Sequence, residues 1–406
     1  MHERTARTFA ALLAGAGILA SVASADVVTD WDKIACQAVA DAKIPTPAAN
    51  RVLALTQTAV YEAVNGITGK YPGGERSGTA AKASLEAAVA AANRAILSDA
   101  LLTQRAAIEE AVQKAVAGIA NEDAKRTGIA VGERAAARVR ELRQDDGTQA
   151  AESYRPATSP GVYVPTTIPA VPQWPERKPW VLSSPAQFRP GPPPELTSET
   201  WARDYAEIKA VGAKASVTRT PAQTEIAKFW EATLPSIYHG VVRAVAEQPG
   251  RDVTRNARLL MAITQGMDDA IISVMDAKYR YAFWRPITAI RNGDQDGNDA
   301  TERDAGWVPF IETPMHPEYP CAHCILAATV GTILKAESGK DPLPELSTTS
   351  YMLEGVTRRW KSTDDFIQEV SDARIYDGVH YRNSTEVGAS MGRKVGALVA
   401  EKHFPP

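Results

Sequence analysis

Apolar residues recur at helical spacing through most of the chain, and this pattern predicts an all-α fold. Helical patterns run over residues 30–65, about 80–120, 122–143 and in amphipathic stretches over 198–248. Pro45 and Pro47 should divide the first of these into two helices. Runs of alternating Val, Ile and Thr are few, so we expect helices joined by long ordered loops, in helical bundles, with little sheet.

The clearest helix carries a charged residue at the end of its apolar face. Intervals of three or four residues place one set of side chains on that face: Leu260, Ile263, Met267, Ile271, Val274 and Lys278. A solvated lysine is not expected on a buried stripe. Lys278 is therefore the first candidate for a functional side chain.

The chain divides by composition into four parts. Residues 1–25 are expected to form a signal peptide and 26–150 an N-terminal helical region. Residues 151–196 are rich in proline and lack periodicity, yet contain Trp174, Trp180 and Phe188, so we expect an ordered loop, here called the strap. Residues 197–406 should form a C-terminal helical catalytic region.

The first 25 residues predict export. Arg4 and Arg7 precede a run of apolar and small residues, and Ala23-Ser24-Ala25 matches a cleavage site. We therefore expect a periplasmic or secreted protein, cleaved near Ala25, with no membrane span in the mature chain. The net charge of −3, without a basic stripe, argues against nucleic acid as a partner. The oligomeric state stays open.

Three segments carry candidate chemistry. Arg285 follows Lys278 by close to two helical turns, so a helix that ends at or just before Arg285, ahead of Pro286, would place both cations on one face. In the second segment, residues 314–324, an apolar helix should begin near Cys321–Cys324 and present His323 at an N-terminus that favours anions.

The third segment holds Arg374 and His380, six residues apart, with Gly378 permitting a break between them. A final helix should start near Ser384. Its glycines recur every four residues (Gly388, Gly392 and Gly396), which favours a close helix contact within the fold.

Together these segments resemble the vanadium-dependent haloperoxidase and type-2 phosphatidic acid phosphatase superfamily. The family signature reads Lys-x6-Arg-Pro, Pro-Ser-Gly-His and Ser-Arg-x5-His. This chain has Lys278-x6-Arg285-Pro286, Pro320-Cys321-Ala322-His323 and Ala373-Arg374-x5-His380. The motifs span residues 278–380, and the order and internal intervals agree.

The resemblance implies a role for each matching position. Lys278, Arg285 and Arg374 would neutralise the oxygens of vanadate or phosphate, and the Ala322 N–H would replace that of the motif glycine. His380 would be the axial ligand to vanadium, or the nucleophile of a phosphatase. His323 would be the acid–base group.

Two positions depart from the signature. Cys321 stands where the family has a serine that donates to the oxyanion, and its thiol would be a weaker donor. Ala373 replaces the leading serine of the third motif. A bridge between Cys321 and Cys324 would protect the thiol from oxidation, and the sequence leaves that pairing open.

The resemblance implies one of two enzymes. Family phosphatases usually carry an aspartate four residues after the third-motif histidine, where this chain has Ser384, so a haloperoxidase using vanadate, peroxide, halide and an organic acceptor is favoured. His316 matches a second histidine of algal bromoperoxidases and favours bromide or iodide. The alternative is a periplasmic acid phosphatase that hydrolyses phosphate esters through a phosphohistidine without a cofactor. A non-catalytic oxyanion-binding protein would keep the cations, but would not need both His323 and His380.

Overall fold

The computed structural model of the protein describes residues 26–73 and 80–405, so the expected signal peptide lies outside the described residues. The fold is mostly helical, as predicted. Its α-helices are α1 (Val27–Asp41), α2 (Thr46–Thr68), α3 (Leu85–Ala100), α4 (Arg105–Ala117), α5 (Glu122–Arg143), α6 (Glu199–Val211), α7 (Pro221–Trp230), α8 (Ser236–Ala246), α9 (Val253–Tyr281), α10 (Pro286–Arg291), α11 (Ala322–Ser338), α12 (Thr363–Tyr376) and α13 (Arg382–His403). Short 3-10 turns are η1 (Ala80–Lys82), η2 (Leu102–Gln104), η3 (Trp174–Glu176) and η4 (Gly293–Gln295).

One hairpin was not predicted. Strands β1 (Leu346–Ser350) and β2 (Leu353–Trp360) pair antiparallel between α11 and α12. Most β2 side chains are partly or fully exposed, so the segment has little of the apolar alternation that marks a strand in a sequence. Trp360 is the exception: it is buried, and its ring packs against Trp230 and Phe366.

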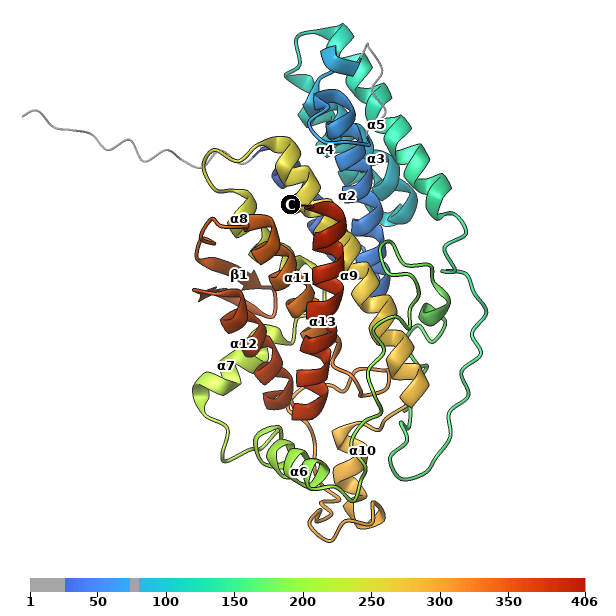
Figure 1. Ribbon diagram of the computed structural model, residues 1–406, viewed down its shortest axis with the longest axis vertical. Coiled ribbons are helices and arrows are strands. Elements are labelled where there is room, and N and C mark those ends of the chain that lie inside the picture. Colours follow the sequence, from blue (N-terminus) through green and yellow to red (C-terminus); the bar gives the residue numbers. More distant parts are fainter. Residues whose placement is uncertain (1–25, 74–79, 406) are drawn as a thin grey trace, which may run out of the picture.

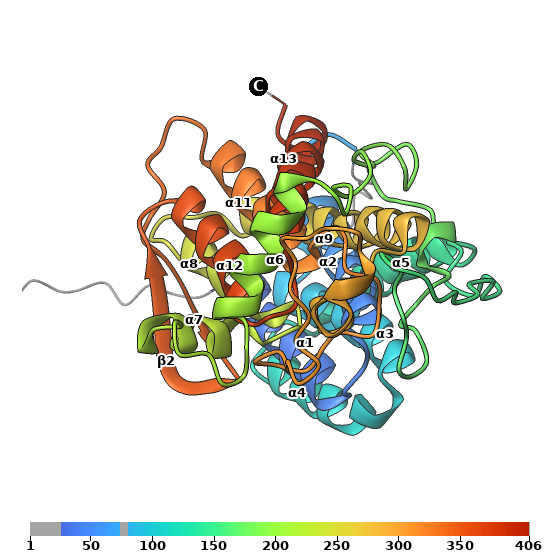
Figure 2. The same cartoon turned by 90° about the horizontal axis from the view of Figure 1, so that it is seen from below.

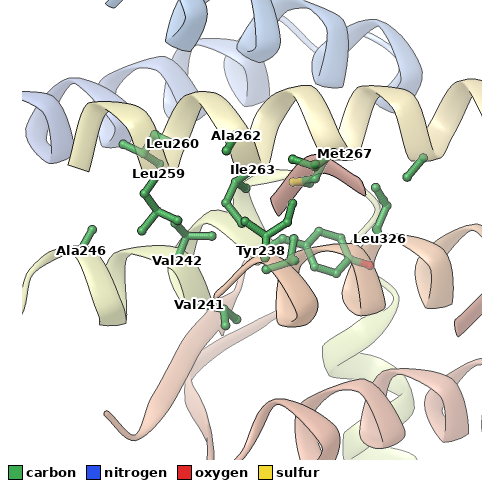
Figure 3. Packing of buried hydrophobic residues seen from close by; sticks show 14 of the residues in the cluster. Tyr238, Val241, Val242, Ala246, Leu259, Leu260, Ala262, Ile263, Met267 and Leu326 are labelled. Atoms are coloured by element: carbon green, nitrogen blue, oxygen red, sulfur yellow. The ribbon is translucent and has the colours of Figure 1, made fainter. Parts of the chain in front are cut away.

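The core is organised around α9, which lies between α2 and α11 (Figure 1). The predicted apolar face of this helix is confirmed, since all six side chains from Leu260 to Lys278 are buried. Asp252 caps the helix by accepting from the amides of Thr254 and Arg255. Figure 3 shows Ile263 and Met267 of α9 packed beside Tyr238 of α8 and Leu326 of α11.

Helices α11 and α13 pack as closely as the glycine spacing predicted. A Cβ atom on Gly392 would lie 2.3 Å from the Ile325 carbonyl oxygen, and one on Gly388 would lie 2.6 Å from that of Cys321. Only a missing side chain allows the two backbones this separation. At one end of the molecule α6, α12 and α13 lie side by side (Figure 2).

The strap is an ordered loop, held by acidic residues of α9. Asp268 forms a buried ion pair with Arg177, with Nη1 at 2.6 Å. Asp269 accepts from three consecutive strap amides, those of residues 180–182. Arg189 binds both oxygens of Asp276 at 2.6 Å. These contacts fix the strap along the lower half of α9 (Figure 1), next to the motif-bearing loops.

Every helix in the described part of the chain is too short or too polar to cross a bilayer.

Candidate active site

Lys278 braces the second motif from behind. Its side chain is fully buried, and Nζ donates to the carbonyl oxygens of Pro317 at 2.9 Å and Glu318 at 2.8 Å. Burial and the nearby charge of Arg285 hold the pKa of Lys278 well below its ordinary value. The lysine thus fixes the loop that carries two other site residues.

The expected helix up to Arg285 is wrong: α9 ends at Tyr281, and Ala282 adopts a left-handed conformation with φ 46°. The following residues pair with the strap instead, where the Trp284 amide donates to Gly161 O at 3.0 Å. Phe283 packs into a cluster of aromatic rings. Arg285 therefore reaches the site from the start of α10, and not along the face of α9.

The Arg285 guanidinium joins the second and third motifs. Nε donates to His316 O at 2.9 Å and Nη1 to Val379 O at 2.8 Å. Nη1 also lies 3.3 Å from His380 Nε2, and Nη2 lies 3.0 Å from His316 Nδ1. Because a guanidinium can only donate, His380 Nε2 carries a lone pair here.

The other nitrogen of His380 is held by a residue that the sequence did not single out. His380 Nδ1 donates to Glu318 Oε1 at 2.8 Å, and the Tyr381 amide donates to the same oxygen at 3.1 Å. Burial raises the pKa of Glu318 to about 7 against the opposing charges of Lys278 and Arg285. Burial and the surrounding cations hold the pKa of His380 well below its ordinary value, so the ring is neutral. This neutral tautomer directs an unprotonated Nε2 away from Glu318.

Position 384, where family phosphatases have an aspartate, is a serine in this chain. Glu318 supplies the carboxylate that contacts His380 instead. The only sequence signal was an acidic residue two positions before Pro320 in a loop otherwise apolar or aromatic. Charged residues are rarely fully buried without a partner, and Glu318 is 0% exposed. Spacing alone could not place it, since it approaches His380 from 62 residues away.

The second motif opens α11. Cys321 caps the helix, and its sulfur is bonded to that of Cys324. The expected thiol donor is therefore wrong for this structure, because the sulfur of Cys321 carries no hydrogen. The cap and the disulfide fix the first turn, which presents Ala322 and His323.

His323 is a neutral ring with one nitrogen engaged. Nε2 lies 3.1 Å from Ala232 O, an acceptor, so Nε2 carries the hydrogen and Nδ1 the lone pair. Burial and the charge of Arg374 hold the pKa of His323 well below its ordinary value. Burial and the charges of Lys278 and Arg285 likewise hold the pKa of His316 well below its ordinary value.

Arg374 is positioned by α12 and by its own loop. Nη1 donates to Trp230 O at 2.8 Å and pairs with Asp377 Oδ2 at 2.6 Å. Its Nε is buried and has no acceptor among the described residues. Burial raises the pKa of Asp377 to about 7, against the attraction of Arg374.

These groups enclose a cavity of about 220 Å³. Of the predicted site residues, five line it, namely His316, Ala322, His323, Arg374 and His380, while Lys278, Arg285 and Cys321 stand behind them. The rest of the lining is mostly apolar: Pro45, Thr46, Pro47, Ala170, Thr233, Ile271, Met275, Pro314 and Leu326. Three buried cations face two carboxyl groups whose pKa values are raised, so the site favours an anion.

Comparison with known proteins agrees with this arrangement. A model of the VCPO second helical-bundle domain matches residues 258–404, which include all three motifs. This region is similar to that domain of the vanadium haloperoxidase family. No curated protein matches the chain.

Solved structures share the vanadium haloperoxidase fold over most of the chain. One is described as the crystal structure of the first bacterial vanadium-dependent iodoperoxidase, with a TM-score of 0.80 and 23% identity over 93% of this chain and 97% of that one. A bacterial vanadium-dependent chloroperoxidase in its apo form has a TM-score of 0.70 and 17% identity over 88% and 92%. The holo form of that enzyme has a TM-score of 0.70 and 17% identity over 89% of this chain and 93% of that one. Likeness at this identity establishes the fold and leaves the halide open.

Proposed function

We propose that the protein is a vanadate-dependent haloperoxidase that oxidises bromide or iodide with hydrogen peroxide. The observation that carries the proposal is the unprotonated Nε2 of His380, held by Glu318 at the wall of a cationic cavity. A neutral imidazole with its other nitrogen bonded to a carboxylate is the usual form of a metal-ligating histidine.

The residues fit vanadate. Arg374 Nε is a buried donor without an acceptor among the described residues, and it belongs to a side chain that lines the cavity. His380 would bind the group through Nε2, Arg374 and the Ala322 amide would bind its oxygens, and Lys278 and Arg285 would offset its charge from behind. Vanadate would supply a Lewis acid that polarises peroxide.

His323 is placed to move the proton that peroxide loses. Its Nε2 is committed to Ala232 O, so Nδ1 is the atom that accepts a proton. The cations that depress the pKa of His323 would be neutralised by a bound anion, and that pKa would then rise toward a useful range.

The apolar lining supports a large halide. Ile271, Met275 and Leu326 offer no hydrogen bonds to replace lost water, so the least hydrated halide enters at the lowest cost. Iodide and bromide are less strongly hydrated than chloride. His316, the position that favours bromide or iodide in the sequence, lines the same cavity. The organic acceptor would react with hypohalous acid after its release.

A phosphatase is the second candidate, and Glu318 is the reason to test it. A carboxylate that orients His380 would serve a phosphohistidine as well as a metal ligand, so Ser384 no longer argues against this activity.

The test compares both activities in one preparation. The purified protein, with and without orthovanadate, is assayed for bromide and iodide oxidation by peroxide and for p-nitrophenyl phosphate hydrolysis. His380→Ala is the inactive variant, and His403→Gln, at the far end of α13, is the matched control. Vanadate-dependent halide oxidation that His380→Ala abolishes and His403→Gln retains supports the proposal. Phosphate release that vanadate inhibits would replace it by the phosphatase.

We also propose export after cleavage near Ala25, on the strength of the N-terminal sequence pattern. Sequencing the N-terminus of protein recovered outside the cytoplasm tests this, and an intact Met1 would contradict it.

A further inference from the structure

A second buried network of charged residues lies outside the catalytic cavity, where α1 meets α8. Asp32 Oδ1 accepts from His239 Nδ1 at 2.7 Å and from Gln57 Nε2 at 3.1 Å. Arg243 Nη1 donates to Asp32 Oδ2 at 2.6 Å. Asp32 and His239 are both 0% exposed.

Cys36 lies beside this network, one helical turn after Asp32 on α1. The Cys36 sulfur, a ring nitrogen of His239 and a carboxylate oxygen of Asp32 all lie within 4.8 Å of one another. His239 Nε2, the nitrogen not bonded to Asp32, is buried without a hydrogen-bond acceptor among the described residues. Cys36 is the free cysteine of the chain, because Cys321 and Cys324 are paired.

The charges around Cys36 disfavour a bound cation. Burial opposes protonation of His239, yet the negative charges of Asp32 and Cys36 raise its pKa to about 10. His239 is therefore an imidazolium at neutral pH, and Arg243 is a second cation beside it. A metal ion would have to displace the proton of His239 and lie next to Arg243. A thiolate instead gains two cationic neighbours.

Cys36 also borders a cavity. Cys36 and Arg243 line a cavity of about 480 Å³ that is separate from the catalytic one. The turn of the β-hairpin, with Tyr351, closes its other side. Cys36 itself is 5% exposed.

We propose that Cys36 is a reactive thiol that hydrogen peroxide oxidises to sulfenic acid, with His239 and Arg243 as positioning residues. The thiolate attacks one peroxide oxygen, so a sulfur–oxygen bond forms and the oxygen–oxygen bond breaks. Sulfur loses two electrons and the peroxide gains them. The sulfur keeps the OH group that it attacked, as sulfenic acid. The departing hydroxide takes the His239 Nε2 proton and leaves as water, and His239 regains a proton from solvent. The proposal is independent of the proposed haloperoxidase activity.

The first test uses the unmodified full-length sequence. Protein is treated with hydrogen peroxide and dimedone, a sulfenic-acid trap, and the Cys36 peptide is quantified by mass spectrometry against time. At pH 6.5 the folded protein should react about tenfold or more faster than the same chain unfolded in urea, because only the fold places His239 and Arg243 beside the sulfur. Equal or slower reaction of the folded protein overturns the proposal.

The second test removes one cation. Arg243→Gln should slow trapping severalfold, and circular dichroism checks that it folds. Arg126→Gln, an exposed ion-pair residue on α5, is the matched control and should react as the unmodified chain does. An unchanged rate in a folded Arg243→Gln protein overturns the role of Arg243.

Discussion

The molecule contains two buried histidines whose Nδ1 atoms are bonded to carboxylates, and the two pairs behave differently. His380 and Glu318 are 2.8 Å apart, and His239 and Asp32 are 2.7 Å apart. All four side chains are buried. Geometry within each pair does not distinguish them.

The two pairs differ in the charges that surround them. Beyond burial, Arg285 and two further cations keep the pKa of His380 below its ordinary value, and Glu318 titrates near 7. Around His239 the attraction of the Asp32 carboxylate outweighs burial. The pKa of His239 rises to about 10, and the pKa of Asp32 is lowered. His380, paired with Glu318, is therefore neutral and has an unprotonated nitrogen at the anion cavity. His239 and Asp32 form an ion pair that joins two helices.

The largest expected effect is on stability. His239→Gln leaves Asp32 with Arg243 and Gln57 but removes the fully buried one of its two cationic partners. Loss of one member of a buried pair costs roughly 3–5 kcal/mol, so urea unfolding should show a loss of this order. A loss below about 1 kcal/mol would mean that His239 is not an imidazolium.

The same pair predicts a pH window. His239 titrates at about 10 in the fold against an ordinary 6.5, so the folded state holds an extra proton between these values. The stabilisation is complete below about pH 6.5 and is lost as pH rises through 10. The unfolding free energy of the unmodified protein should fall more steeply from pH 7 to 10 than that of His239→Gln. His403→Gln is the control, since the pKa of His403 is lowered to about 4.

Removal of Glu318 should affect activity more than stability. Glu318→Ala frees His380 Nδ1, and losing such a partner of a ligating histidine costs roughly 10–100-fold in activity or affinity. Halide oxidation after vanadate loading measures the loss.

A rescue separates positioning from a general structural role. Ser384 lies on α13 at the place of the family aspartate, and its side chain interacts with Glu318. Glu318→Ala combined with Ser384→Asp should recover part of the activity. If the double variant is folded but no better than Glu318→Ala, the positioning role fails.

The smallest expected effect concerns the disulfide. Cys321→Ser with Cys324→Ala removes the bridge, yet a serine hydroxyl can cap the first turn of α11 as Cys321 does. Activity should stay within about threefold of the original for that reason. A much larger loss would show that the disulfide itself holds Ala322 and His323 in place.

Local pattern was sufficient for most helices and for the motif residues. The spacing along α9 predicted a buried Lys278, and the glycines of α13 predicted its close contact with α11. What spacing could not predict depends on distant segments. Pairing of Trp284 with the strap ends α9 early, and Glu318 meets His380 only in the folded chain. The β-hairpin was missed because its exposed strand carries little apolar alternation.

The central claim is that the unprotonated Nε2 of His380 would bind vanadate. Its most direct test is calorimetric titration of orthovanadate into the purified protein, His380→Ala and His403→Gln. We predict one vanadate bound per chain in the unmodified protein and in His403→Gln, and binding weakened at least about tenfold in His380→Ala. Equal binding by His380→Ala, or no binding by the unmodified protein, would contradict it.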